Sequence, residues 1–188
     1  MNLSTKSSFV DVAFAVCTAI HRAGTEAVLV GGGAATFYAP RAYRTDDMDF
    51  VVPFSLSPAS AQPILALGFE QDPPGSGIYR RPDLRWSLEF PQGPLAIGSE
   101  VITDWDTHER QGEILHVIRI EDCVRDRLSA GIYWRDPNAT RQAALVATGH
   151  KIDLEEIEKW CILEGGQSTF NLFKAFLANE TPKPEAGS

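Results

Sequence analysis

The sequence predicts an α/β (α+β) protein with a mixed sheet flanked by helices and a helical C-terminal extension. Strand-like and helix-like segments alternate to about residue 120, and only helical patterns follow. The length of 188 residues suits one domain with such an extension. We therefore expect a sheet domain over residues 1–120, a helical portion packed on it over 121–180, and a flexible tail over 181–188.

The sheet domain is expected to begin with a helix over residues 8–23, because apolar side chains recur there at helical spacing and Gly24 follows. A buried strand over 27–30 then runs into Gly31, Gly32 and Gly33, and a short helix over 34–38 ends before Pro40. A helix is expected over 57–67, with Pro58 in its first turn. The remaining expected strands cover residues 48–52, 77–80, 85–90 and 113–120.

The C-terminal portion carries four expected helices, over about 121–130, 140–148, 154–164 and 168–178. Asp153 and Ser168 are suitable N-caps for the last two. Aromatic residues in this portion are expected to anchor the core. They are Trp134, Trp160, Phe173 and Phe176.

Composition limits the classes of function. Hydrophobic residues make up 44% and charged residues 22% of the chain, as in ordinary globular proteins. The net charge of -8 argues against a protein whose whole surface binds nucleic acid, and weakly against binding to an anionic membrane. No apolar run reaches the ~18–20 residues that span a bilayer. We interpret the apolar segment 9–20, which Asp11 interrupts, as the first helix of a cytoplasmic protein.

The cysteines and histidines show no ligand or disulfide pattern. The three cysteines are far apart and odd in number, so we expect them to be small buried side chains: Cys17, Cys123 and Cys161. The four histidines show no metal-binding spacing: His21, His108, His116 and His150.

The segment from Val30 to Ala35 combines a strand, a glycine turn and a helix start. Backbone N–H groups at a helix start are unpaired, and the helix dipole adds positive potential. Glycine lets an anion approach the backbone closely. Gly31, Gly32 and Gly33 therefore indicate a site suited to phosphate.

Asp47 and Asp49 lie two residues apart on the next expected strand. Such residues point to the same face, so their carboxylates project together while Met48 turns to the core. Mg²⁺ favours hard oxygen ligands and often uses one or two carboxylates plus substrate phosphates. A phosphate cradle beside two carboxylates is the equipment of phosphoryl or nucleotidyl transfer.

Glu89, on the expected strand 85–90, is the candidate for a third carboxylate. If that strand neighbours the one that carries Asp47 and Asp49, Glu89 would bind a metal or accept the proton of an attacking hydroxyl.

This constellation resembles the nucleotidyltransferase superfamily, which has the DNA polymerase beta-like fold. Within it, the segment is similar to the bacterial branch of AbiEii-type abortive-infection and toxin proteins. The matching residues are Gly31, Gly32, Ala34, Arg44, Thr45, Asp47 and Asp49. The resemblance implies Mg²⁺ or Mn²⁺ held by Asp47, Asp49 and Glu89.

The resemblance also implies a nucleoside triphosphate as substrate and transfer of its nucleoside monophosphate to a hydroxyl of RNA, protein or a small molecule. Gly31–Gly33, Arg44, Thr45 and Arg127 would bind the triphosphate. Arg127 stands where many relatives have lysine, so it can hold a phosphate but cannot act as a base. A role in toxin–antitoxin or phage-defence systems, with a cognate antitoxin as partner, is a further implication.

Other interpretations stay open. The glycines also suit a plain turn, and Asp46–Asp49 also suits a solvated charge run. The fold would also serve a catalytically incomplete module that binds a nucleotide or a partner protein. An aminoglycoside-type nucleotidyltransferase is a third alternative, although Arg44 and Thr45 fit the toxin-like branch better. Whether Glu89 reaches the two aspartates separates the enzyme from the binding module.

Overall fold

The computed structural model describes residues 3–53 and 60–180. Its helices are α1 (Phe9–Arg22), α2 (Gly31–Tyr38), α3 (Gln62–Ala66), α4 (Ile120–Tyr133), α5 (Pro137–Thr148), α6 (Leu154–Leu163) and α7 (Gln167–Glu180). Its strands are β1 (Val28–Val30), β2 (Asp47–Val51), β3 (Glu70–Gln71), β4 (Ile78–Arg80), β5 (Ser87–Glu89), β6 (Ala96–Ile97), β7 (Glu100–Val101), β8 (Asp106–Arg110) and β9 (Glu113–Val117).

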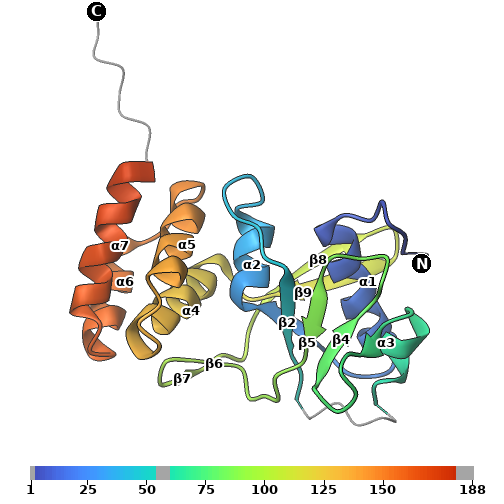
Figure 1. The fold of residues 1–188 in the computed structure, drawn as a ribbon. Helices are drawn as coiled ribbons and strands as arrows, with labels where there is room; N and C mark the ends of the chain where they lie inside the picture. Colours follow the sequence, from blue (N-terminus) through green and yellow to red (C-terminus); the bar gives the residue numbers. More distant parts are fainter. Residues whose placement is uncertain (1–2, 54–59, 181–188) are drawn as a thin grey trace, which may run out of the picture.

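Seven of the strands form one mixed sheet in the order β3-β4-β5-β2-β1-β9-β8 (Figure 1). In its centre, β1 pairs antiparallel with β2 and parallel with β9, and β2 pairs parallel with β5. The pair β6–β7 forms a separate two-stranded hairpin. The two mutually antiparallel strands β1 and β2 therefore lie at the middle of the sheet, where both have neighbours.

The central strands bury one face under α2. Leu29, Met48, Phe50 and Leu88 alternate with polar or smaller residues, and none of the four side chains is exposed. A Cβ atom at Gly33 would lie 2.8 Å from Leu29 Cδ1, so α2 packs closely on this face. Apolar alternation on β2 thus sends Met48 and Phe50 to the core and leaves Asp47 and Asp49 for the other face.

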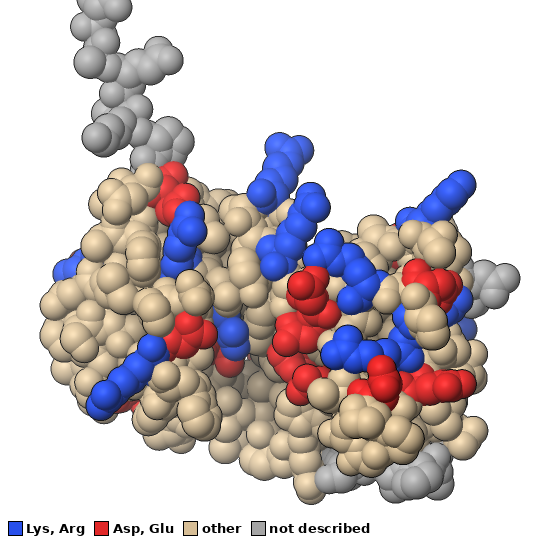
Figure 2. Space-filling model, in the orientation of Figure 1, with Lys and Arg blue, Asp and Glu red and all other residues tan. Residues whose placement is uncertain are grey.

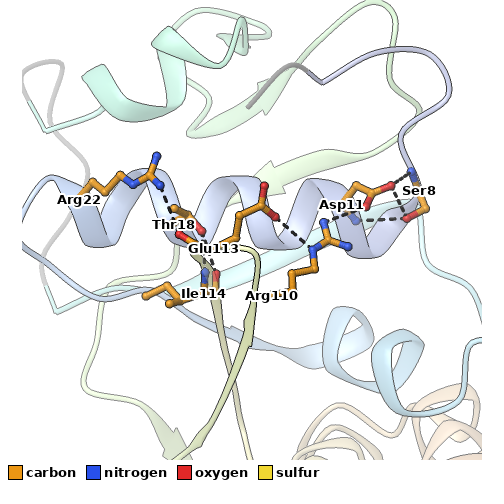
Figure 3. Close-up of polar contacts among 8 residues, drawn as sticks. Ser8, Asp11, Thr18, Arg22, Arg110, Glu113 and Ile114 are labelled. Carbon is orange, nitrogen blue, oxygen red and sulfur yellow. Dashed lines mark hydrogen bonds and ion pairs between the residues drawn. The ribbon is translucent and has the colours of Figure 1, made fainter.

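Helix α1 is fixed to the sheet by polar contacts as well as by its apolar face (Figure 3). Ser8 caps the helix, and it exchanges hydrogen bonds with Asp11 in a capping box. The hydroxyl of Thr18 donates to the carbonyl of Ile114 at 3.1 Å and accepts from its N–H at 2.9 Å. Asp11 also pairs with Arg110 at 2.8 Å, so both ends of the helix contact the β8–β9 hairpin or its flanks.

The C-terminal helices stand to one side of the sheet, and α2 lies between them and the strands (Figure 1). α2 contacts β1 and β2 on one side and α4 and α5 on the other. Only two residues lie between the end of β9 and the start of α4, so the chain passes directly from the sheet into the helical group.

Most of the expected elements are confirmed, with shifts of a few residues at their ends. Two differ in a way that matters. The helix after β1 begins at Gly31 rather than at residue 34, because the three glycines form its first turn instead of a loop before it. The strand expected to reach residue 120 ends at Val117, and Ile120 already opens α4. Most of the residues of the expected helix over 57–67 that precede Gln62, Pro58 among them, lie outside the described residues.

The sequence patterns missed the short strands β3, β6 and β7 and the five-residue strand β8. β8 consists of charged and polar residues at the sheet edge, and it has no apolar run that would indicate a strand. Asp153 does cap α6, but Ser168 lies inside α7. Trp160 is buried as expected. Trp134, also expected in the core, is 81% exposed and follows the last residue of α4.

The expectations for the other apolar side chains are confirmed. Cys17, Cys123 and Cys161 are buried and free, and Phe173 is buried with Phe176 packed against the same core. In residues 3–53 and 60–180, no helix combines the length and the apolar character that crossing a bilayer requires.

We predict that Thr18→Val destabilises the protein. The exchange keeps the side-chain shape but leaves the Ile114 N–H and C=O without the hydroxyl that now pairs with both. Loss of such partners costs about 1–3 kcal/mol of the free energy of unfolding. Urea denaturation of the wild type, Thr18→Val and Thr18→Ser measures the free energy of unfolding. Thr18→Ser, which keeps the hydroxyl, should recover most of the loss, and equal stability of Thr18→Val and wild type would contradict the assignment.

Candidate functional site

Asp47 and Asp49 open β2 and project from the face of the sheet opposite to Met48 and Phe50. Asp47 is exposed, and Asp49 is partly buried. Figure 2 shows acidic side chains gathered over β2 and β5, beside a hollow that separates them from the C-terminal helices. The two carboxylates thus share one face of the sheet, as the spacing predicts.

Glu89 joins them from the neighbouring strand. β2 and β5 run parallel in a register that pairs Asp49 with Glu89 and Asp47 with Ser87. Paired residues of adjacent strands point to the same face, so the Glu89 carboxylate lies on the aspartate face. Burial raises the pKa of Asp49 to about 6, and the negative charges of Asp47 and Glu89 add to the shift.

Gly31 allows α2 to begin directly against Asp49. Its φ is +63°, a left-handed conformation that favours glycine, and a Cβ atom there would lie 2.8 Å from Asp49 Oδ2. The same atom would lie 3.3 Å from Arg127 Nη2. Gly31 is therefore the point at which the helix start, a carboxylate and a guanidinium meet.

Arg127 reaches this point from α4. Its side chain is 17% exposed, and it donates to Asp126 Oδ2 from Nη2 at 2.7 Å and from Nε at 3.0 Å. Burial works against the charged form, but Asp126 and, more weakly, Asp49 outweigh it, so the pKa of Arg127 lies above its ordinary value. The guanidinium is thus a permanent positive charge beside Asp49.

Thr45 is held next to Asp47. Its backbone N–H donates to Thr36 Oγ1 at 3.0 Å, and its hydroxyl donates to Asp47 Oδ1. A Cβ atom at Gly32 would lie 3.3 Å from Thr45 Oγ1, so this glycine makes room for the hydroxyl. Gly31 and Gly32 therefore pack closely against Asp49 and Thr45 as well as being suited to an anion.

Arg44 is placed differently. It is exposed and lines a cavity of about 300 Å³ together with Ser8, Thr36 and Trp86. The nearby carboxylate of Asp46 pairs with Arg85. Arg44 forms no ion pair with any other residue in 3–53 or 60–180, so its charge stays available.

A tighter group of potential ligands lies elsewhere. Among the described residues, one trio has its ligand atoms all within 4.8 Å of one another: His21, Glu26 and His116. The carboxylates of Asp47, Asp49 and Glu89 are spaced more widely than this. Sequence spacing missed the trio, because 95 residues separate its two histidines and the packing of α1 on β9 brings them together.

Comparison with solved structures shows the fold. A crystal structure of an antigenic nucleotidyltransferase-like protein from Paracoccidioides brasiliensis superposes with a TM-score of 0.59 over 96% of each chain, at 14% sequence identity. The chain has a nucleotidyltransferase-like fold. No family model matches the sequence, and no curated protein matches it.

The likeness concerns the nucleotidyltransferase-like fold, since so low an identity does not carry over the role of any residue. What the geometry adds is that Asp47, Asp49, Glu89 and Arg127 meet on one face of its sheet.

We predict that Asp49→Asn stabilises the protein in metal-free buffer. The raised pKa means that folding favours the protonated carboxyl, so the wild type loses stability as pH rises from about 4 through about 6. Above this window the variant should have a free energy of unfolding that is about 1–3 kcal/mol larger. Denaturation at pH 4 and pH 8 tests this.

The matched control is Asp46→Asn, which removes the same charge from an exposed residue nearby. It should leave the pH dependence of stability unchanged. A pH profile of Asp49→Asn that parallels the wild-type profile would disprove the assignment.

Proposed function

We propose that this chain is a cytoplasmic, Mg²⁺-dependent nucleotidyltransferase that transfers a nucleoside monophosphate from a nucleoside triphosphate to a hydroxyl. The observation that carries the proposal is the meeting of Asp47, Asp49 and Glu89 on one face of paired strands, with Arg127 beside them. The nucleotidyltransferase-like fold supports it, because the three carboxylates lie on its central strands.

The donor set fits Mg²⁺ or Mn²⁺. It consists of carboxylate oxygens alone, which are the ligands that these hard cations prefer. Burial, and then the negative charges of Asp47 and Glu89, raise the pKa of Asp49, so a bound cation would stabilise its ionised form.

A bound metal ion would neutralise the triphosphate and polarise its phosphorus centre. Asp47 and Asp49 would hold it, and the hydroxyl of Thr45 fixes the orientation of Asp47. Glu89 accepts the proton of the attacking hydroxyl. The hydroxyl oxygen then bonds to the α-phosphorus, the bond from that phosphorus to the β-phosphate oxygen breaks, and pyrophosphate leaves.

Positive charge for the phosphates comes from Arg127 and from the N-terminal amides of α2 at Gly31, Gly32 and Gly33. Arg127 is already oriented by Asp126, which leaves donor hydrogens of its guanidinium for a phosphate oxygen. Arg44, which is exposed and without an ion-pair partner in the described part of the chain, supplies a further charge near Thr45.

The acceptor would be a hydroxyl of RNA, protein or a small molecule. The resemblance to AbiEii-type proteins favours a role in a toxin–antitoxin or phage-defence system, with a cognate antitoxin as protein partner. Incubation with each labelled triphosphate, Mg²⁺ and total RNA or protein identifies both nucleotide and acceptor.

A binding module without catalysis is the second candidate. It is favoured by one observation, the spacing of the three carboxylates, whose oxygens do not converge within 4.8 Å as a trio in the described chain. Such a module would bind a nucleotide or a partner protein at the same face of the sheet. The two experiments below separate it from the enzyme.

Triphosphate binding should require a divalent cation and should be lost in Asp47→Asn/Asp49→Asn. The double exchange removes the anionic ligands that hold Mg²⁺, and the cation bridges the protein to the phosphates. Calorimetry with ATP, GTP, CTP and UTP, with Mg²⁺ and with EDTA, measures this. Asp83→Asn/Asp153→Asn removes the same two charges elsewhere and should bind like wild type. Equal affinity in wild type and the Asp47/Asp49 variant would place the nucleotide elsewhere.

Glu89→Gln should abolish transfer and leave the fold intact. The exchange is nearly isosteric, so the melting temperature should change little. A group that takes a proton or stabilises charge in the transition state typically contributes a factor of about 10²–10⁴ to the rate. Triphosphate binding should survive better than turnover, because Asp47 and Asp49 remain.

The readouts are the turnover of labelled triphosphate and a thermal melt of each variant. Unchanged turnover in Glu89→Gln would remove Glu89 from the site. Wild-type protein that binds a triphosphate but transfers no nucleoside monophosphate to any acceptor would establish the binding module.

A further inference from the structure

Three side chains that are remote in sequence converge beside the first strand of the sheet. His21 lies in the last turn of α1, Glu26 in the connection to β1, and His116 in β9. Their ligand atoms all lie within 4.8 Å of one another, and the two imidazole rings are 6.0 Å apart between centroids. Two imidazoles and one carboxylate form a donor set that zinc sites in proteins use.

His116 is the fixed member of the trio. Its side chain is 5% exposed, and its Nε2 is buried without a hydrogen-bond partner in residues 3–53 and 60–180. Its other ring nitrogen, Nδ1, lies 2.9 Å from Thr107 Oγ1. If Nδ1–H donates to that oxygen, Nε2 presents its lone pair, the arrangement found in metal-ligating histidines.

Burial is consistent with a neutral imidazole. It lowers the pKa of His116, and His21 lowers it further while Glu26 opposes the shift. A neutral ring is the form that binds a metal. A buried nitrogen without a partner is costly in a folded protein, and a metal ion would remove that cost.

The other two members are free to close on an ion. His21 and Glu26 are exposed, so each can turn without disturbing the core. Ligands of a tetrahedral zinc ion lie about 2.0–2.2 Å from the metal, so donor atoms lie about 3.3 Å apart. Closure from 4.8 Å needs rotation of exposed side chains only.

The backbone already holds this geometry in place. Cys17 lies one helical turn before His21, and its Sγ accepts from the His116 N–H at 3.2 Å and donates to the Ala27 carbonyl at 3.2 Å. Helix, strand and connecting segment are thereby joined at the position where the three side chains meet.

We propose that His21, Glu26 and His116 form a zinc-type site for a divalent transition metal, separate from the carboxylate site. Nitrogen donors select such ions, whereas the all-oxygen set of Asp47, Asp49 and Glu89 selects Mg²⁺. With three protein ligands, a fourth position falls to water. His21 and Glu26 also line an open cavity of about 740 Å³ whose wall includes Val28, Val51 and Trp105, so that position borders a largely apolar cavity.

The test is titration of the tag-free full chain with Zn²⁺ by calorimetry, and with Co²⁺ by visible absorption, which reports coordination geometry. Both are performed with excess Mg²⁺ and repeated in Asp47→Asn/Asp49→Asn, so that binding at the carboxylates is excluded. We expect one equivalent of metal and cobalt bands of a four-coordinate nitrogen–oxygen site in both backgrounds.

His21→Gln and Glu26→Gln change exposed residues and should each weaken Zn²⁺ binding at least about tenfold, while Thr107→Val should weaken it by about tenfold through loss of the orienting contact. His150→Gln is the matched control, because that exposed histidine contacts Tyr38 instead. It should bind like wild type.

A wild type that binds no Zn²⁺, or that binds it equally well in His21→Gln/Glu26→Gln, would overturn the proposal. Melting curves of each variant show that the fold persists. Loss of binding in His150→Gln to the same extent as in His21→Gln would also overturn it.

Discussion

The contact between Gly31 and Asp49 is the constraint on which the site depends. A Cβ atom at Gly31 would approach Asp49 Oδ2 to 2.8 Å, so only glycine lets α2 begin against β2 at this distance. α2 in turn contacts β1, β2, α4 and α5. The position of α2 therefore sets how far the C-terminal helices stand from the sheet, and whether Arg127 reaches the carboxylates.

The same packing creates an electrostatic cost that other residues partly offset. Asp49 is surrounded by apolar strands, by Asp47 and by Glu89, and its pKa rises to about 6. Arg127 and the start of α2 supply positive potential on the opposite side. Asp126, which holds Arg127, returns negative charge to the same place. Negative charge therefore exceeds positive charge around Asp49, and a bound cation would neutralise the excess.

Much of the fold and of this site is encoded locally, and the rest depends on contacts between distant residues. Alternation on β2 was enough to place Asp47 and Asp49 on one face, and periodicity identified α1 and α4–α7. The β2–β5 register that brings Glu89 opposite Asp49 is a pairing across 40 residues, so the sequence raised it only as a condition. The polar strand β8 carries no apolar alternation, and the exposure of Trp134 depends on where α4 ends.

The trio of His21, Glu26 and His116 depends most strongly on contacts between residues that are distant in the sequence. His21 and His116 meet because α1 packs on β9, where Cys17 accepts from the His116 N–H. On β1, Val28 is opposite His116 of β9 and Val30, on the same face, is opposite Asp49 of β2, so His116 and Asp49 share one face of the sheet. Neighbouring sites with nitrogen and oxygen donors stay distinct only if ligand chemistry, rather than distance, selects the ion. Ligand chemistry can make that separation, because imidazole donors suit zinc-type ions whereas carboxylates alone suit Mg²⁺ and Mn²⁺.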